Sequence, residues 1–480
     1  MITIIETGLK PAKLGHLRLP ALAALLLLLA GSLYAQDSFF DEDDLFGSID
    51  AVVETVAEAD PAKSVKSLLV SDAVRIGGRL TGKLEASFRY HKPWDEGLDL
   101  FNADEYGLAP SLASLLFFDA RPTEASRFYG SVKAAWPFSA GQPMPDIEVF
   151  ELFSDFNYDD SLFFRFGKQT INWGVGYFFS PANIINLEKI NVLDPEAQLE
   201  GPLALRVHYP VPGTQHNLWA YGVFDSKSMK PEDTAMAAKA EFALASWELG
   251  AGAFYKYKDP FTLMATASGS AGKFSLFGEA TAQLGTKRVW VTEIATPPPF
   301  PDPFEDLITK TIPSDYDHDW FFKASAGFMY RNSDAKINLL GQYLYDGEGY
   351  ANKDRKARVQ EARDIKKNNG PLIENLGLGL EFDLLLKALV ANSGQHYAAL
   401  SFSRRELFLK KLDFSVFAMG NLSDLSAFVR PELSYSFFDG LSASLGAFFA
   451  LGYDDGEYII LSDGRALGIS LAFNIGSGAF

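Results

Sequence analysis

One segment near the start of the chain reads Arg79-Leu80-Thr81-Gly82-Lys83-Leu84-Glu85-Ala86-Ser87-Phe88-Arg89-Tyr90. Its odd positions are charged or hydroxylic, and its even positions are apolar, small or aromatic. Successive side chains of a β-strand point to opposite faces, so this pattern predicts a strand with one polar and one apolar face. Repeated many times, such strands would build a β-barrel with its apolar face toward lipid and its polar face toward a lumen.

The same alternation returns at residues 127–134, 274–284 and 467–475. Turn signals separate the strands at 158–161, 212–214, 332–334 and 438–440, while longer connections are predicted at 91–107, 177–201, 287–319 and 347–371. Long loops on one side and tight turns on the other are typical of outer-membrane barrels. A count of strands gives 19, but single-chain bacterial barrels have an even number. The segment 384–395 lacks alternation, so we predict about 18 strands, with 16 and 20 as alternatives.

A soluble all-β sandwich also alternates, with its apolar side chains turned inward. Aromatic residues favour the barrel because they gather near the predicted strand ends, where interfacial girdles lie. The pairs are Phe88 and Tyr90, Trp136 and Phe138, Trp173 and Tyr177, Tyr343 and Tyr345, and Tyr435 and Phe437. The predicted fold class is therefore all-β, a transmembrane antiparallel β-barrel with long extracellular loops.

The first 35 residues read as a signal peptide. Lys10, Lys13 and Arg18 precede an apolar run over 19–30, and Ala35 is a candidate last residue before cleavage. The run is shorter than the roughly 20 residues of a membrane-spanning helix, which favours cleavage over an uncleaved anchor. Residues 36–73 form an acidic segment, interpreted as a periplasmic leader, a plug of the barrel or an unstructured leader. Residues 74–480 are the predicted barrel.

Composition narrows the function. The formal net charge is −18, which argues against nucleic-acid binding, and the chain has no cysteine, which excludes disulfides and cysteine-ligated metals. No pair of histidines has metal-ligand spacing. The cluster Asp315, Asp317, His318 and Asp319 is more easily explained as a solvated loop end than as a cation site or a hydrolase. We therefore expect no enzyme activity, no metal and no cofactor.

One segment carries more than a generic strand pattern. Arg165-Phe166-Gly167-Lys168-Gln169 leads to Trp173-Gly174, then to Phe178-Phe179-Ser180-Pro181-Ala182-Asn183 and Pro202-Leu203. This resembles a signature of porin-like outer-membrane barrels, including alginate-export-like porins, and Asn421-Leu422-Ser423-Asp424 with Pro431 and Tyr435 is similar to such barrels too. The matching residues cover about a tenth of the chain. The resemblance implies a porin-like barrel and says nothing of the solute.

The polar parity of the strands predicts which side chains line the pore. The candidates are Arg79, Lys83, Glu85, Arg89, Lys133, Glu151, Asp155, Arg165, Gln169 and Arg206, with Glu241 and Glu279 on the same parity. Porins commonly fold one loop inward, and the loop at 177–201 follows the fifth predicted strand. Its candidate constriction residues are Asn183, Glu188, Lys189 and Asp194, with Asn186 and Asn191 beside them. The alternative is that the wall charges pair with one another and that this loop is exposed.

The function predicted from these features is an outer-membrane channel for passive or weakly selective diffusion of small hydrophilic solutes. The alternatives are a transporter for hydrophobic or polymeric cargo and a surface-exposed binding barrel. The expected partners are outer-membrane lipid, the barrel-assembly machinery and small solutes, and the sequence leaves open whether a homotrimer forms. The basic segment 353–367 is interpreted as a solvated extracellular loop, or as a surface helix that contacts anionic lipopolysaccharide or a solute.

Overall fold

A computed structural model describes most of the predicted barrel. The described residues are 74–91, 93, 102–137, 146–171, 173–187, 190, 199–225, 228, 230–288, 290–294, 308–311, 319–375, 379–438 and 440–479. The predicted signal peptide, the acidic leader, the cluster at 315–318 and the residue Phe480 lie outside this part. In the part of the chain that the structure describes, no helix combines the length and the hydropathy needed to cross a bilayer.

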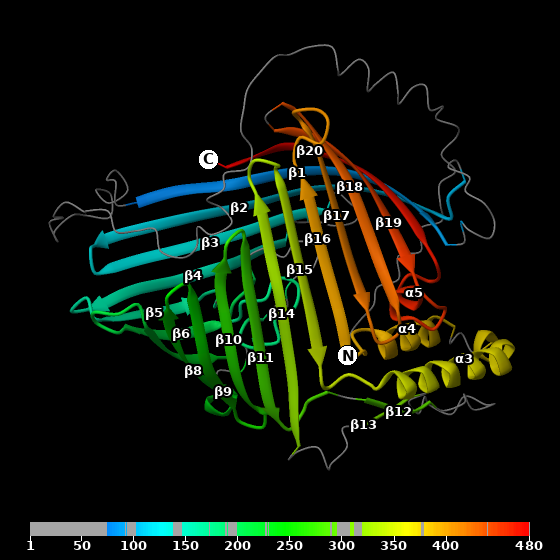
Figure 1. The fold of residues 1–480 in the computed structure, drawn as a ribbon, viewed down its shortest axis with the longest axis horizontal. Coiled ribbons are helices and arrows are strands. Elements are labelled where there is room, and N and C mark those ends of the chain that lie inside the picture. The colour runs from blue at the N-terminus through cyan, green and yellow to red at the C-terminus, as the bar shows by residue number, and fades with distance from the viewer. Residues whose placement is uncertain are drawn as a thin grey trace. The chain divides into compact units, whose positions relative to one another are not determined.

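Eighteen strands form one closed, antiparallel barrel, in agreement with the predicted fold class. Each strand pairs with the next along the chain, β11 pairs with β14, and β20 pairs with β1 to close the wall (Figure 1). The barrel strands are β1 (Val74–Tyr90), β2 (Glu105–Thr123), β3 (Ser126–Pro137), β4 (Asp146–Tyr158), β5 (Leu162–Lys168), β6 (Leu203–Pro210), β7 (Asn217–Phe224), β8 (Ala235–Leu244), β9 (Trp247–Lys256), β10 (Phe261–Ala271), β11 (Phe274–Leu284), β14 (Trp320–Asn332), β15 (Ile337–Asp346), β16 (His396–Arg404), β17 (Leu412–Asn421), β18 (Ser426–Phe438), β19 (Leu441–Leu451) and β20 (Leu467–Ala479). The strands β12 (Trp290–Ile294) and β13 (Ile308–Thr311) form a separate hairpin.

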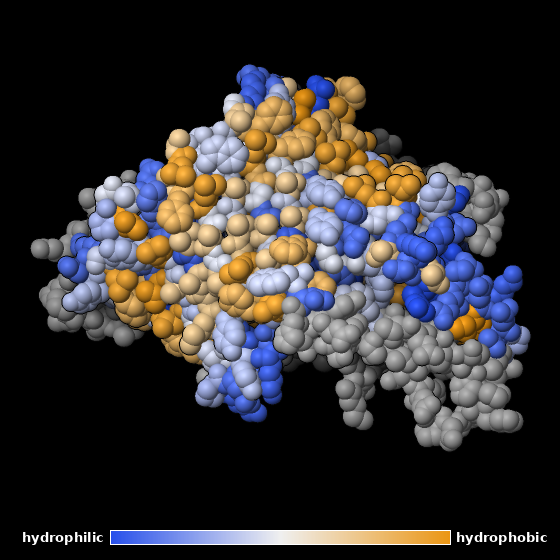
Figure 2. Space-filling model, turned by 60° about the horizontal axis from the view of Figure 1, so that its bottom comes forward, coloured by the Kyte–Doolittle hydropathy of each residue, from blue (hydrophilic) through white to orange (hydrophobic). Residues whose placement is uncertain are grey.

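The predicted parity of the first strand is present in the barrel. Leu80 and Leu84 are exposed on the outer face of β1, and Leu112 and Leu116, on the same face of β2, are exposed as well. Apolar side chains gather over the strands on the face shown in Figure 2, and hydrophilic residues gather beyond them. Exposed apolar side chains over so many strands need a covering that is not water, as the wall of a membrane barrel does.

The connections differ in length between the two ends of the barrel. At the end where β1 begins, the turns are short, and they include 124–125, 245–246, 272–273 and 333–336. At the other end, here called the long-loop end, the longest connections are 169–202, 285–319, 347–395 and 452–466. Short turns at one end of the barrel and long loops at the other were predicted from the sequence.

The long-loop end also carries helices. The connection after β15 continues well past residue 371 and contains α3 (Asn352–Asn375) and α4 (Gly379–Val390), while α5 (Glu457–Leu461) lies between β19 and β20 (Figure 1). The short helix η2 (Pro231–Asp233) precedes β8. The strand counted at 384–395 is wrong, because most of it belongs to α4. Its consecutive leucines lack the period of two that a half-buried strand requires, and removing it from the count leaves 18.

Candidate functional site

The chain leaves β5 at the long-loop end and turns into the barrel. We call residues 169–187 the inner segment; residue 172 is not described. Its first contacts are with the adjacent strands β6 and β4. The side-chain Nε2 of the fully buried Gln169 donates to Ala204 O at 3.0 Å, and the backbone amide of Thr170 donates to Glu151 Oε1 at 3.1 Å. Asn186 closes the segment on itself, because its side chain bonds both the amide and the carbonyl oxygen of Ile171.

Two inward side chains of the distant wall hold the inner segment. Glu279 on β11 accepts the Val175 amide at 2.8 Å and the Ala182 amide at 3.3 Å. Gln342 on β15 accepts the amides of Tyr177, Phe178 and Phe179 and donates to Phe179 O at 2.6 Å. Backbone groups that leave a sheet need such partners when they are buried. The inner segment is therefore a fixed part of the lumen.

Apolar contacts complete this attachment. Trp173 is buried and meets Tyr221 of β7 edge to face, with ring centroids 5.3 Å apart. Further along, Tyr177 contacts Phe277 of β11, and Phe178 contacts Phe417 of β17. Trp173 and Tyr177 were expected in an interfacial girdle, and the structure corrects this. The chain leaves the sheet after Lys168, so strand parity no longer applies to them.

The glycine of the Gly-Lys-Gln motif has a steric role at this exit. Gly167 has φ of +139°, and a Cβ there would lie 2.1 Å from Leu152 O and 2.6 Å from Phe153 Cα. Only glycine tolerates both conditions. The close approach is to the backbone of β4, so this glycine lets β5 end tightly against its neighbour before the chain turns inward.

Most predicted pore-lining charges have partners in the wall. Lys83 pairs with Glu85 at 2.6 Å, and Asp155 pairs with Arg165 at 2.6 Å. Lys133 lies over the ring of Phe150, and Arg206 lies over the ring of Trp219. The Arg89 guanidinium donates to Ser462 O at 2.9 Å, and Arg79 is exposed on the inward face near the end of β20.

The predicted constriction residues are only partly within the described chain. Asn183 lies in the inner segment, where its Oδ1 accepts a hydrogen bond from Asn186 Nδ2 at 2.7 Å. Glu188, Lys189, Asn191 and Asp194 lie outside the described residues. Sequence reasoning missed the anchor Gln342. The alternation around it was visible, but no local signal distinguishes an anchoring amide from any other inward polar residue.

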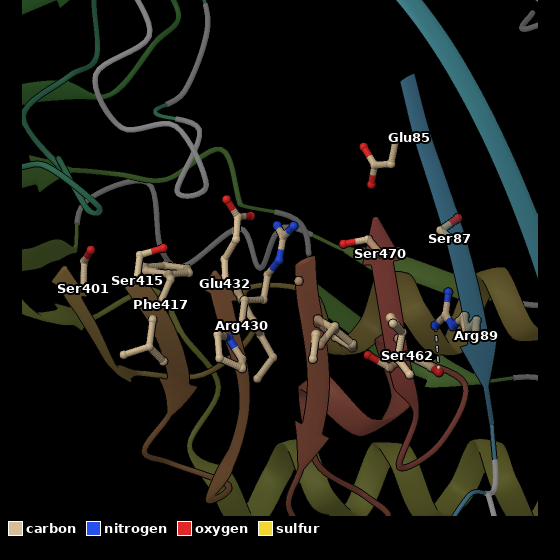
Figure 3. Close-up of a pocket in the computed structure, with 18 of the residues that line it drawn as sticks. Glu85, Ser87, Arg89, Ser401, Ser415, Phe417, Arg430, Glu432, Ser462 and Ser470 are labelled. Atoms are coloured by element: carbon tan, nitrogen blue, oxygen red, sulfur yellow. Dashed lines mark hydrogen bonds between the residues drawn. The ribbon is translucent and has the colours of Figure 1, made fainter. Parts of the chain in front are cut away.

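A cavity of about 960 Å³ lies beside the inner segment. It is lined by β1 and β2, by β14 to β20, and by Tyr177 and Phe178. Glu85 and Arg89 of β1 face it from one side, and Arg430 and Glu432 of β18 face it from another (Figure 3). Arg430 and Glu432 were not among the predicted pore-lining residues, although they share the inward parity of β18 with Ser434.

A buried polar cluster at the long-loop end joins the helices to the barrel. Arg355 of α3 is fully buried and pairs with Asp424 in the β17–β18 turn at 3.2 Å. Asp424 also accepts the Glu457 amide at 2.9 Å. The Glu457 carboxyl in turn accepts Tyr397 Oη at 2.8 Å and Asn421 Nδ2 at 2.7 Å. The basic segment is thus a helix, and its Arg355 points inward rather than toward solvent.

Burial raises the pKa of the Glu457 carboxyl above its ordinary value of 4.5, and the nearby Asp424 adds to this. The folded loop therefore holds the proton more tightly than the unfolded loop does. Its stability is fully present below about pH 4.5 and decreases as the pH rises toward the raised pKa. We expect hydrogen exchange in residues 452–466 to accelerate from pH 4 to pH 8, after correction for intrinsic exchange.

The variant Glu457→Gln should remove this pH dependence, whereas Glu361→Gln on α3 should retain it. An unchanged pH profile in Glu457→Gln would show that another group controls the loop.

Comparisons with known proteins concern the fold. No protein-family model matches the chain, and no curated protein matches its sequence. Among solved structures, OccK11 (OpdR) of Pseudomonas aeruginosa is similar over 84% of this chain and 96% of its own, with 8% identity and a TM-score of 0.44. The outer membrane protein OpdK of the same organism is similar over 85% and 99%, with 8% identity and a TM-score of 0.44. A mutant porin of Rh. blastica is similar over 83% and 100%, with 8% identity and a TM-score of 0.37.

At 8% identity these likenesses concern the fold alone. The predicted β-barrel fold is confirmed by the pairing of its strands, and the solved structures that resemble it include outer-membrane channels and a porin. The finer resemblance, to alginate-export-like porins, stays a prediction. The chain is thus an 18-stranded barrel that is structurally similar to outer-membrane channels and porins.

Proposed function

We propose that this chain is an outer-membrane channel through which small hydrophilic solutes diffuse, and that the inner segment narrows its lumen. The observation that carries the proposal is the attachment of the inner segment to Glu279 and Gln342. Both side chains lie on the inner face of the wall, and both are buried against the segment. Their hydrogen bonds hold a constriction across the barrel while leaving the cavity of about 960 Å³ beside it.

Barrel size and surface chemistry support a pore. Small eight-stranded barrels fill with side chains, whereas barrels of about 16 to 18 strands leave an aqueous channel. The exposed apolar side chains on the outer face suit lipid, and the charged side chains on the inner face suit water. Arg79, Lys83, Glu85 and Arg89 are therefore proposed as pore-lining residues, with outer-membrane lipid as the surrounding partner.

The mixed charge of the wall supports weak ionic selectivity. Lys83 with Glu85 and Arg165 with Asp155 are opposite charges in contact, so each pair presents little net charge to a passing ion. Such a pore admits hydrophilic solutes mainly by size.

The test is conductance of the purified protein in planar lipid bilayers, together with swelling of proteoliposomes in isotonic sugar. We expect ohmic channels in KCl, with a low preference between K⁺ and Cl⁻, and swelling rates that fall as solute size rises. Folded protein that inserts into bilayers without any ohmic current would overturn the proposal.

A further inference from the structure

The cavity beside the inner segment has an ordered chemical lining. Seen across the strands, one inward position per strand forms a row that we call the polar belt: Ser403, Ser415, Glu432, Gly446, Ser470 and Ser87, from β16 to β1. These residues face each other directly in the strand register. All six line the cavity.

The row of inward positions next to the polar belt, toward the long-loop end, has different chemistry. It carries Phe417 on β17, Arg430 on β18, Phe448 on β19 and Arg89 on β1. Phe417 is also braced from inside the lumen, because Phe178 of the inner segment lies 5.2 Å from it between ring centroids. Aromatic rings and guanidinium groups therefore alternate along the row next to the polar belt.

Several charged side chains around the cavity already have partners, whereas one cation and one anion on β18 have none in the part of the chain that the structure describes. Glu85 is engaged by Lys83 at 2.6 Å, Glu105 by His91 at 3.0 Å, and Arg89 by the Ser462 carbonyl oxygen. Arg430 and Glu432 lie two residues apart on one face of β18, and neither has a hydrogen-bond or ion-pair partner among the described residues. An adjacent cation and anion of this kind offer donors and acceptors without a net charge.

A close-packed glycine and an unused acceptor accompany this pair. A Cβ at Gly446 would lie 2.8 Å from Ser470 Oγ and 3.8 Å from Glu432 Oε2, so a larger residue there would press against Ser470. Asn338, whose neighbour across the sheet is Ser403, has a buried Oδ1 that accepts no hydrogen bond within the described chain. The cavity volume falls in the roughly 300–1,000 Å³ range of small-molecule sites.

We propose, on the basis of the channel function above, that this cavity is a binding site for neutral polyhydroxylated solutes of the monosaccharide and disaccharide class. A sugar ring presents C–H groups on one face and hydroxyls around its edge. Phe417 and Phe448 can pack against the C–H face of the ring. Glu432, Arg430 and the serines of the polar belt can form hydrogen bonds with its hydroxyls. An ion would gain little from a pair of opposite charges, and an apolar solute would leave the belt unpaired.

The test measures block of the KCl current through single channels of the full-length protein by glucose, sucrose and maltose. Polyethylene glycol of matched hydrodynamic radius, lysine and benzoate are the comparison probes. We expect saturable block by the sugars, a non-saturable decrease with polyethylene glycol, and weaker block by the two charged probes.

Substitutions separate binding from the pore itself. Glu432→Ala and Ser470→Val should weaken sugar block, Glu432→Ala by about tenfold, as expected for one hydrogen bond to a charged group. Glu432→Gln should retain most of the block, because the amide still bonds hydroxyls. The matched controls Glu248→Ala and Ser275→Val, inward on β9 and β11 and outside the cavity lining, should leave it unchanged.

The outcomes distinguish the two proposals. Ohmic KCl current with sugar block no stronger than that of polyethylene glycol or of a charged probe would overturn the binding site and leave the channel standing. Sugar block that Glu432→Ala and Ser470→Val leave intact would also overturn it. Absence of KCl current would overturn the channel and the site together.

Discussion

Replacing Gln342 with alanine should increase the single-channel conductance several-fold. The substitution leaves the buried amides of Tyr177, Phe178 and Phe179 without their shared acceptor and removes a donor from Phe179 O. Each buried polar group left unpaired costs about 1–3 kcal/mol, so the inner segment gains by leaving the wall and becoming hydrated. The measurement is the conductance histogram in planar bilayers, together with the open-state noise.

The control for this variant is Asn474→Ala on β20. Asn474 is also an inward amide, and its side chain donates to Ser442 Oγ at 3.3 Å rather than to the inner segment. A heat-modifiability gel checks that both variants are folded. Equal conductance in Gln342→Ala and in the parent protein would show that the inner segment does not limit the current. Glu279→Ala should act in the same direction, since it frees the amides of Val175 and Ala182.

Replacing Arg355 with methionine should release α3 from the barrel. Arg355 is fully buried and pairs with Asp424, whose carboxylate would stay buried without its cation. Breaking a buried pair from one side costs about 3–5 kcal/mol. Arg355 also donates to Asp455 O at 3.0 Å, so the loop that carries α5 loses a second tie. We expect trypsin to cleave the basic helix α3 quickly in the variant, while the barrel stays folded.

Arg358→Met is the matched control, because Arg358 pairs with Glu361 on the same helix in a half-exposed position. Exposed pairs of this kind contribute about 0–1 kcal/mol, so the protection of α3 should hardly change. The double variant Arg355→Met with Asp424→Asn should recover part of the protection, since no unpaired charge then remains. Equal trypsin rates for the Arg355 and Arg358 variants would contradict a stabilising role of the buried pair.

The alternation of polar and apolar residues predicted most of the barrel strands. Segments such as 274–284 alternate over their whole length, and β11 has those bounds in the structure. The two faces of a barrel strand meet different solvents, so hydrophobic and polar side chains alternate with a period of two. This period can be read from consecutive residues. The segment 384–395 lacked it, and the even-number rule for closed barrels correctly removed it from the count.

The partners of the inner segment lie far from it in the sequence. An inward loop was one of two interpretations of residues 177–201, and it was based on their position after the fifth predicted strand. Its partners were not predicted, because Val175 and Glu279 are more than a hundred residues apart, as are Phe178 and Gln342. A single inward carboxylate on β11 looks the same in sequence whether it faces water or holds a backbone amide.

Consecutive residues were enough to predict the alternation of the strands and the polarity of each face, because both depend on neighbours within one strand. The even strand number came from the general rule for closed barrels. Only the folded chain reveals which inward residues anchor the inner segment, which charges neutralise each other, and how the polar belt aligns across six strands beside the cavity. Those relations depend on the strand register and on the path of a loop through the lumen. Both are set by contacts between residues far apart in the chain.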